Sequence, residues 1–384
     1  MNFEFSDEQK QMGVEARRFL AAKCPTTAVR TVLEGDQAYD KALWAGLAEM
    51  GFLGVQIPEA YGGLGLGYLE LCVIAEEMGR ALAPVPFSSS VFLATEFLLL
   101  AGCEAQKAAW LPRLAAGEAI GTFAHAERAG AVTPKMIQTS AAEGRLSGVK
   151  TAVPDGGIAD FAIVSARTAG GSIGLYLVDL NQPGVTRTTL ETIDPSRGHV
   201  SLELAGATAE LLGDPAEGWS ILEQVFDRAA ILTAFEQIGG ADRALEIARD
   251  YALERMAFGR PIGSFQAIKH KLADMLVDLE HARSTAYHAV WALSNASDDP
   301  ALAASIAQAT ASAAFSRIAA DTIQVLGGIG FTWEHQAHLY FKRAATDAAL
   351  LGTPEEHRSR VADMVLDTAV ADADAARIAT GFPA

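Results

Sequence analysis

The spacing of hydrophobic residues changes twice along the chain. Up to residue 118, apolar residues recur at helical intervals, broken by the turn-rich loop at 58–67. From 119 to 216 the pattern shortens to the alternation that is typical of strands, and from 217 to 384 helical spacing returns. We therefore expect an N-terminal helical domain (1–118), a middle β domain (119–216) and a C-terminal helical bundle (217–384).

Short strands dominate the predicted β domain. His199–Leu204 alternates polar and apolar residues, which predicts a strand with one buried face. Two further apolar runs, Phe161–Val164 and Leu175–Val178, are bounded by glycine- and proline-containing turns. Because strands so close together leave no room for crossover helices, we expect a small antiparallel barrel or sandwich.

The C-terminal region predicts four long helices between residues 219 and 371. Two stripes at helical spacing would form its core. They are Leu272, Met275, Leu276 and Leu279, followed by Leu302, Ile306, Ala309 and Ala313. Alanine is dense from 301 to 320, which favours close packing of helices in a four-helix bundle. The predicted fold is thus mainly α, with a central β domain.

Charge and composition narrow the possible functions. The 384 residues include 47 acidic and 30 basic ones, a net charge of −17, which disfavours binding to nucleic acids and to anionic membranes. The three cysteines are too few and too widely separated to indicate a disulfide framework or a zinc site. The charged start of the chain does not resemble a secretory signal, so we expect a cytoplasmic protein.

Familiar short motifs provide little evidence for a cofactor or metal site. The glycines at 63, 65 and 67 do not match a dinucleotide-binding fingerprint and follow no predicted strand. His335 and His338 stand three residues apart with Glu334 outside them, unlike the zinc-binding pattern with histidines four apart around a glutamate. We therefore expect no metal.

Two segments near the end of predicted helices are more informative. The first runs from Tyr251 to Ile262, where Arg255 precedes Phe258 and a glycine, and a helix is expected to end at 258–259. Arginine can grip a pyrophosphate through two parallel hydrogen bonds, although a helix-end arginine is as often a solvated cation. The second, from Gln324 to Phe331, leads a helix into glycines 327, 328 and 330. Such backbone can approach a ligand closely or can simply end a helix.

Together, the motifs resemble those of the acyl-CoA dehydrogenase family over essentially the whole chain. They are the Pro-Glu…Gly-Gly-Leu-Gly loop at 58–65, the Arg-x-x-Phe-Gly…Gln…Leu-Ala-Asp-Met run at 255–275 and the Gln-x-Leu-Gly-Gly-x-Gly run at 324–330. The resemblance implies an FAD-containing tetramer that desaturates an acyl-CoA between Cα and Cβ. A glutamate would remove the α-proton while hydride passes to the flavin, and electron-transferring flavoprotein would be the acceptor.

The resemblance also implies how the two segments act. Arg255 and Phe258 would contact the pyrophosphate and adenine side of the FAD of a neighbouring subunit. Gln324, Gly327 and Gly328 would line the same site. All five residues are present.

The catalytic base of the family is missing from both of its known positions. The common pattern has a glutamate before Gly-Thr late in the bundle, where this chain has Leu351. A second subgroup has its glutamate shortly after Phe-Asp in the first long helix of the bundle, where this chain has Ala229. Neither side chain can take a proton, so we assign no catalytic residue.

The flavin-facing segments also depart from the family pattern. Thr-Glu-Pro-x-Ala-Gly-Ser-Asp becomes the run at 126–132, with Ala126 in place of threonine. Lys-x-Trp-Ile-Thr becomes the run at 150–154, with Ala152 and Pro154 in place of tryptophan and threonine. Residues for the reactive side of the flavin are therefore lost, whereas those for a neighbour's FAD are kept.

This division resembles the non-catalytic subunit of α2β2 acyl-CoA dehydrogenases, in which a homologous partner carries the base. By analogy, the substrate would be a fatty-acyl-CoA or a steroid side-chain CoA ester. Three alternatives stay open: a homotetramer with a displaced base at Asp227, Glu236 or Glu355, a flavin monooxygenase on the same fold, and a structural scaffold that binds no flavin.

Overall fold

The computed structural model describes residues 5–130, 132–295 and 299–366. Its first part is helical, as predicted. The elements are α1 (Asp7–Lys23), α2 (Thr26–Glu34), α3 (Lys41–Glu49), η1 (Glu59–Tyr61), α4 (Tyr68–Ala81), the π-helical η2 (Ser88–Ala94), α5 (Thr95–Ala101) and α6 (Glu104–Ala115). A capping box begins α1: the Gln9 backbone N–H donates to Ser6 Oγ (3.2 Å), and the Ser6 N–H donates to Gln9 Oε1 (2.8 Å).

The middle region is an eight-stranded sheet. Its strands are β1 (Gly121–Ala124), β2 (Ser140–Ala142), β3 (Arg145–Pro154), β4 (Phe161–Arg167), β5 (Ile173–Asp179), β6 (Val185–Leu190), β7 (His199–Thr208) and β8 (Glu210–Leu212). They follow the order β6-β7-β3-β2-β4-β5-β8, and β1 pairs with β4. The three predicted strands are confirmed as parts of β7, β4 and β5.

Two details of the β prediction need correction. Among the described residues the sheet does not close into a barrel, because β6 and β8 stand at opposite ends of the strand order. It is also not purely antiparallel, since β1 and β2 both run parallel to β4. β1 leaves the helical region and is joined to β4 by a long excursion instead of a hairpin, which permits parallel pairing.

A β-bulge interrupts the pairing of β3 with β7. Lys150 pairs with Leu202, but the next pair is Val153 with Val200, so β3 carries an additional residue. Within this bulge Ala152 has a left-handed φ of 50°. Bulges redirect side chains next to functional sites, and this one lies where the sheet meets the bundle.

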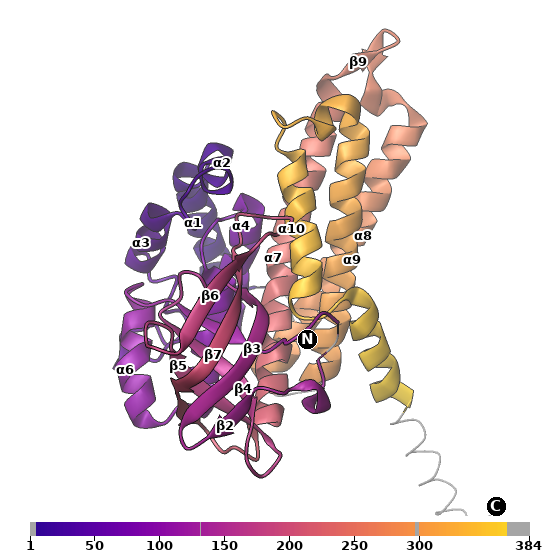
Figure 1. Cartoon of the computed structure of the whole chain (residues 1–384). Helices are drawn as coiled ribbons and strands as arrows, with labels where there is room; N and C mark the ends of the chain where they lie inside the picture. The colour runs from indigo at the N-terminus through magenta and orange to yellow at the C-terminus, as the bar shows by residue number, and fades with distance from the viewer. Residues whose placement is uncertain (1–4, 131, 296–298, 367–384) are drawn as a thin grey trace, which may run out of the picture.

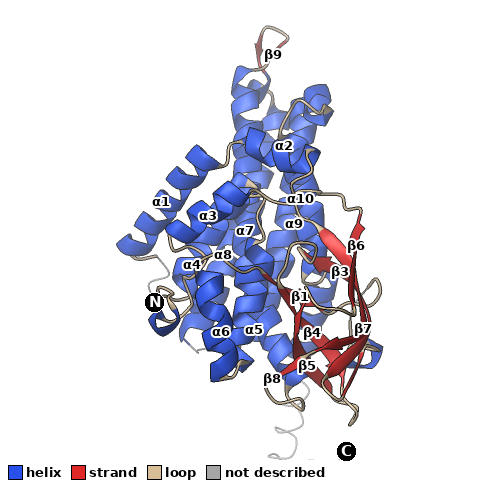
Figure 2. Cartoon of the chain, turned by 60° about the vertical axis from the view of Figure 1, so that its left-hand side comes forward, coloured by secondary structure: helices blue, strands red, loops and turns tan. Residues whose placement is uncertain are grey.

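The C-terminal region is built from α7 (Gly218–Glu254), α8 (Gln266–Asn295), α9 (Pro300–Leu326) and α10 (Ala337–Leu350). A further helix covers residues 354–366. Figure 1 shows α7 to α10 side by side along one flank of the molecule, with the sheet against their lower part; Figure 2 shows the helices of the N-terminal region against the bundle beside the sheet. In the described residues, no helix combines the length and the apolar character that a membrane crossing requires.

The bundle core follows the predicted stripes only in part. Met275 and Leu279 are buried, but Leu276 is 50% exposed. On α9, Ile306 also reaches the surface, and its place in the core is taken by alanines of the neighbouring helix face such as Ala304 and Ala307. The alanine-rich helix can pack on more than one side, so hydrophobic spacing alone does not identify its buried face.

Two glycines let α4 and α7 cross in contact. A Cβ on Gly79 would lie 1.8 Å from the carbonyl oxygen of Glu236, and one on Gly239 would lie 1.7 Å from that of Glu76. Any side chain would therefore push the helices apart. This crossing fixes the N-terminal region on the first helix of the bundle.

The turn after α7 differs from the prediction. The helix ends at Glu254, four residues early, and Arg255 caps it. The chain then forms a small hairpin of β9 (Met256–Ala257) and β10 (Arg260–Pro261). Phe258 (φ 53°) and Gly259 (φ 77°) form its two-residue turn, in which left-handed backbone replaces the expected end of the helix. Figure 1 shows this hairpin projecting beyond the bundle; the short helix η4 (Ile262–Ser264) leads from it into α8.

Candidate functional site

A cavity of about 430 Å³ lies where the sheet, the first turns of α7 and the end of α10 meet. Aromatic and aliphatic side chains dominate its wall, and most of its charges come from the bundle. The lining residues used below are Phe123, His125, Ala126, Thr151, Ala152, Pro154, Trp219, Leu222, Glu223, Phe226, Asp227, Ala349, Leu350, Leu351, Glu356, His357 and Arg360. Segments that are far apart in the sequence thus form one site.

The two predicted base positions have different environments. Leu351 follows the last residue of α10 and lines the cavity, so an acidic residue there would face a bound molecule. Ala229 is fully buried in α7 and does not line the cavity. The structure therefore brings one of the two positions to the site, and its side chain is aliphatic.

Only one of the three candidate displaced bases reaches this cavity. Asp227 lines it, but its carboxylate is paired with Arg360, with Nη2–Oδ2 at 3.0 Å. Burial raises the pKa of Asp227 above its ordinary value, and the guanidinium opposes that shift. Glu236 is buried elsewhere in an ion pair with Arg197, and Glu355 is a surface residue 3.1 Å from Arg358. The Arg360 guanidinium occupies both carboxylate oxygens of Asp227, so Asp227 would have to leave this ion pair before it could accept a proton from a ligand.

Glu236 belongs to a buried ionic network between the three regions of the chain. Arg197, from the loop before β7, contacts Glu236 of α7 and lies 3.3 Å from Asp347 of α10. Arg343 of α10 donates from Nε to Asp194 Oδ2 at 2.8 Å. Burial, opposed by Arg197, raises the pKa of Asp347 to about 7. This network positions α10, whose end forms part of the cavity wall.

The two segments that are expected to face a flavin, and that depart from the family pattern, lie at the cavity. Ala126, Ala152 and Pro154 all line it. The Thr151 N–H donates to the Ala126 carbonyl at 2.8 Å, so this bulged part of β3 holds the loop after β1. None of the three side chains can offer a hydroxyl group to a ligand.

Sequence reasoning missed a polar chain behind this wall. Lys150, fully buried, donates to Glu127 Oε1 (2.8 Å), to the His125 carbonyl (3.1 Å) and to Ser165 Oγ (3.3 Å). The same hydroxyl lies 3.1 Å from His125 Nδ1. Burial lowers the pKa of Lys150 to about 8, and burial together with the Lys150 charge lowers the pKa of His125 to about 3. The available signal was a lysine within the predicted β domain, because a lysine that is buried there needs a buried partner.

The five predicted cofactor-binding residues lie at the opposite end of the bundle. Arg255 and Phe258 lie at the end of α7 and in its hairpin, and the Phe258 side chain is 95% exposed. Gln324 is on the last turn of α9, and Gly327 and Gly328 follow in η5 (Gly327–Phe331). No heavy atom lies within 4 Å of a Cβ built on either glycine, so backbone is open to approach. We call these five residues the tip.

The tip and the cavity are separated by the length of α7. Trp219 and Leu222 line the cavity at the start of this 37-residue helix, and Arg255 caps its other end. At 1.5 Å per residue the helix is about 55 Å long. One dinucleotide cannot contact both ends of such a helix, so the tip and the cavity of one chain cannot serve the same cofactor.

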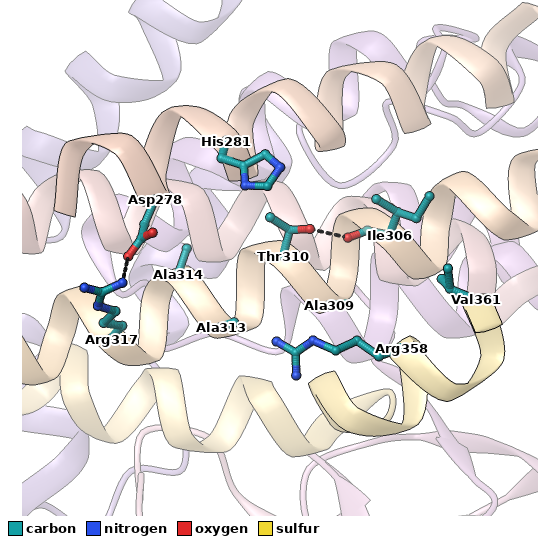
Figure 3. A pocket seen from close by; sticks show the side chains of 10 residues that line it. All are labelled: Asp278, His281, Ile306, Ala309, Thr310, Ala313, Ala314, Arg317, Arg358 and Val361. Atoms are coloured by element: carbon teal, nitrogen blue, oxygen red, sulfur yellow. Dashed lines mark hydrogen bonds and ion pairs between the residues drawn. The ribbon is translucent and has the colours of Figure 1, made fainter. Parts of the chain in front are cut away.

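A second hollow, of about 420 Å³, lies among α8, α9 and the helix over 354–366. Alanines 309, 313 and 314 form its floor, and Figure 3 shows its charged side chains at the edges. Several of its polar side chains already have partners: Arg317 Nη1 lies 2.9 Å from Asp278 Oδ2, and Thr310 donates to the Ile306 carbonyl at 2.6 Å. None of the predicted site residues lines this hollow. Within the described ranges, no group of three or more His, Cys, Asp or Glu residues is arranged to hold a metal ion.

Comparison with family models gives two matches. The acyl-CoA dehydrogenase N-terminal domain matches residues 6–118, and the acyl-CoA dehydrogenase C-terminal domain matches residues 216–366. Together they cover more than half of the chain. The second match contains all five tip residues and the cavity-lining residues of α7 and α10.

Comparison with individual proteins points to the same family as the family models. The chain is 36% identical over 363 residues to acyl-CoA dehydrogenase IpdE2 of Mycobacterium tuberculosis, covering 94% of this chain and 98% of the relative. The ChsE4-ChsE5 complex from the same organism contains a chain that is 30% identical, with a TM-score of 0.86 and coverage of 95% and 99%. The Tcur3481-Tcur3483 steroid acyl-CoA dehydrogenase gives 31% identity, a TM-score of 0.86 and the same coverage. By its domains, its fold and its relatives, this chain is a member of the acyl-CoA dehydrogenase family.

Proposed function

We propose that this chain is the base-lacking subunit of a mixed acyl-CoA dehydrogenase, in which it completes the FAD site of a homologous catalytic partner. The observation that carries the proposal is the division along α7. Groups suited to a dinucleotide are exposed at the tip, whereas the cavity at the other end has Leu351 where an acid would face the substrate. The tip must therefore act on a cofactor whose reactive end is held by another subunit.

The residues of the tip fit the phosphate and adenine part of FAD. Arg255 offers a permanent cation to a pyrophosphate, and the exposed Phe258 ring offers a flat apolar face to a base. The Gln324 amide can donate and accept hydrogen bonds, while Gly327 and Gly328 allow backbone N–H groups close to phosphate oxygens. FAD, when bound, supplies the two-electron acceptor for the oxidation.

The cavity of this chain does not fit the reactive half of the reaction. Removal of an α-proton needs a positioned base, and the carboxylates at the cavity are Glu223, Asp227 and Glu356. Asp227 is held by Arg360, Glu223 accepts from the Trp219 indole at 2.9 Å, and Glu356 accepts from the Thr353 N–H at 2.7 Å. We infer that proton abstraction belongs to the partner.

The names of the relatives support a bulky substrate and a mixed assembly. ChsE4-ChsE5 is a complex of two differently named proteins, and Tcur3481-Tcur3483 is called a steroid acyl-CoA dehydrogenase. We propose a steroid-derived or fatty acyl-CoA thioester as the substrate, an α2β2 tetramer as the assembly and electron-transferring flavoprotein as the acceptor.

The test is co-expression with a homologue that carries the missing glutamate. The mixed complex should hold FAD and oxidise acyl-CoA, whereas this chain alone should bind FAD poorly, as judged by absorbance at 450 nm. Arg255→Ala should weaken FAD binding by the complex about 10- to 100-fold, because it removes a charge-assisted contact. Arg249→Ala is the matched control, since Arg249 is an exposed arginine of the same helix that pairs with Asp250. Equal FAD affinity in the two variants would contradict the interfacial role.

A homotetramer with a displaced base is the second candidate, because Asp227 does line the cavity. In the mixed complex, Asp227→Asn should change the turnover rate only a few-fold, whereas loss of a general base costs about 10²- to 10⁴-fold. A hundredfold loss with FAD content unchanged would favour the homotetramer.

A further inference from the structure

The polar chain behind the cavity wall determines the hydrogen-bonding state of His125. An ammonium group has three N–H bonds, and Lys150 directs one each to Glu127, to the His125 carbonyl and to Ser165 Oγ. Ser165 is fully buried, and its Oγ accepts from Lys150. Among the described residues, the acceptor beside its hydroxyl proton is the ring nitrogen His125 Nδ1, 3.1 Å away, so the hydroxyl donates to Nδ1. Nδ1 is then the acceptor of a neutral imidazole.

The proton of the neutral ring therefore lies on Nε2. Burial and the Lys150 charge keep the imidazole uncharged at physiological pH. His125 lines the cavity, and no residue that the structure describes accepts a hydrogen bond from Nε2. The ring is thus a fixed hydrogen-bond donor in a wall that is otherwise mostly apolar.

Aromatic rings surround this donor and fix its orientation. The Phe123 ring stacks on the imidazole, with centroids 5.5 Å apart and planes 18° apart. Phe226 meets it edge-on at 5.6 Å, and Trp219 lies 5.7 Å away. With Leu222 and Leu350 in the same wall, the cavity is suited to a flat or compact apolar molecule.

The charges at the cavity disfavour an anionic ligand. Asp227 and Arg360 neutralise each other, which leaves the carboxylates of Glu223 and Glu356. Both lie on the bundle side and would repel phosphates held near them. An uncharged ligand avoids this repulsion.

We propose that the cavity binds an uncharged, largely apolar ring compound through a carbonyl oxygen that accepts a hydrogen bond from His125 Nε2. This site lies in the chain's own cavity, at the other end of α7 from the tip, and does not depend on the proposed role in FAD binding. Its test can therefore fail or succeed separately from that role.

The experiment uses the full chain without FAD and a matched pair of probes. 9-Fluorenone and fluorene share one ring skeleton, and only the former has a carbonyl oxygen. In equilibrium dialysis, the wild-type chain should bind 9-fluorenone about two- to tenfold more tightly than fluorene, the range expected for one neutral hydrogen bond. Octanoyl-CoA, which is anionic, should bind more weakly than 9-fluorenone.

Three variants connect binding to the donor and to the cavity. His125→Phe should equalise the two probes and leave fluorene affinity within twofold, whereas His125→Gln, which keeps an N–H donor, should retain part of the preference. Ala349→Trp places a large side chain in the lining on the last turn of α10 and should weaken both probes at least tenfold. Thermal unfolding identifies which variants are folded.

Four results would overturn the proposal. They are equal affinity of the wild-type chain for the two probes, an undiminished preference in folded His125→Phe, binding unaffected by Ala349→Trp, and tighter binding of octanoyl-CoA than of 9-fluorenone. If His125→Phe does not fold, the His125→Gln and Ala349→Trp variants decide.

Discussion

Arg197 connects the three regions of the chain, and its replacement by methionine should destabilise the protein strongly. The buried guanidinium donates to Ser88 Oγ of η2 at 3.1 Å, pairs with Glu236 of α7 and lies 3.3 Å from Asp347 of α10. Methionine keeps much of the side-chain length but removes the charge. Glu236 and Asp347 would then be buried carboxylates with a poorer set of partners.

The expected loss of folding free energy follows from the buried carboxylates that lose Arg197 as a partner. Removing one partner of a buried ion pair typically costs about 3–5 kcal/mol, because the remaining charge is desolvated without compensation. Arg343 Nη1 stays 3.7 Å from Glu236, so we expect the lower part of this range, about 3 kcal/mol. Arg249→Met is the control: Arg249 forms an exposed pair with Asp250, and such pairs contribute about 0–1 kcal/mol.

Urea unfolding followed by circular dichroism measures the difference. Arg197→Met should lower the urea midpoint clearly more than Arg249→Met, without a change in the slope of the transition. The loss should be smaller at pH 5.5 than at pH 8, because the orphaned carboxylates can take up protons at the lower pH. Equal midpoints for the two variants would refute the idea that this network holds the regions together.

Three further predictions concern single positions. Burial raises the pKa of Asp347 from 3.8 in the unfolded chain to about 7 in the folded one, so the folded state binds an additional proton between these pH values and stability falls as pH rises through that window. Asp347→Asn should therefore flatten the decrease in melting temperature between pH 5 and 7.5. An equally steep decrease in this variant would contradict the reasoning. Gly239→Ala should lower the melting temperature by several degrees because its Cβ would overlap the Glu76 carbonyl, whereas Gly328→Ala, with open space around it, should change stability little. Leu351→Glu should not confer acyl-CoA-dependent dye reduction on the isolated chain, because Ala126, Ala152 and Pro154 still line the cavity and offer a flavin no hydroxyl group. Turnover by this variant without a partner would show that the base was the only missing part.

The order of the regions was predictable because each has its own hydrophobic period. The strand at 199–204 is confirmed, since its alternating pattern depends on neighbouring residues in the sequence. The hairpin at Phe258 and Gly259 was not predicted, because residues with left-handed backbone can end a helix or form a two-residue turn. The outward position of Leu276 depends on which helix packs beside α8, and spacing within one helix carries no such information.

The candidate site shows the same limit. The motif residues at 126, 152 and 351 line one cavity. The link from Lys150 through Ser165 to His125 was invisible in the sequence, because it joins the loop after β1 to β3 and β4 across the sheet. A bulge in β3 and the parallel pairing of β1 with β4 create that neighbourhood, and neither has a signature in hydrophobic spacing.

The two ends of α7 impose opposite physical requirements, which explains why they can change independently. At the tip, Arg255 and Phe258 are exposed and make few contacts that the fold needs, so a ligand or a partner is the clearest reason to keep an exposed aromatic ring. At the cavity, Leu351 stands where the resemblance implies a base for the substrate, and Ala152 stands where it implies a group beside the flavin. The buried Lys150 and Glu127 behind them are nevertheless paired. Removing either member of that pair would leave a buried charge, so this part of the scaffold is constrained whichever residues line the cavity in front of it. Under the function that we propose, such a chain gives up proton abstraction and keeps both its fold and the groups that complete a neighbouring site.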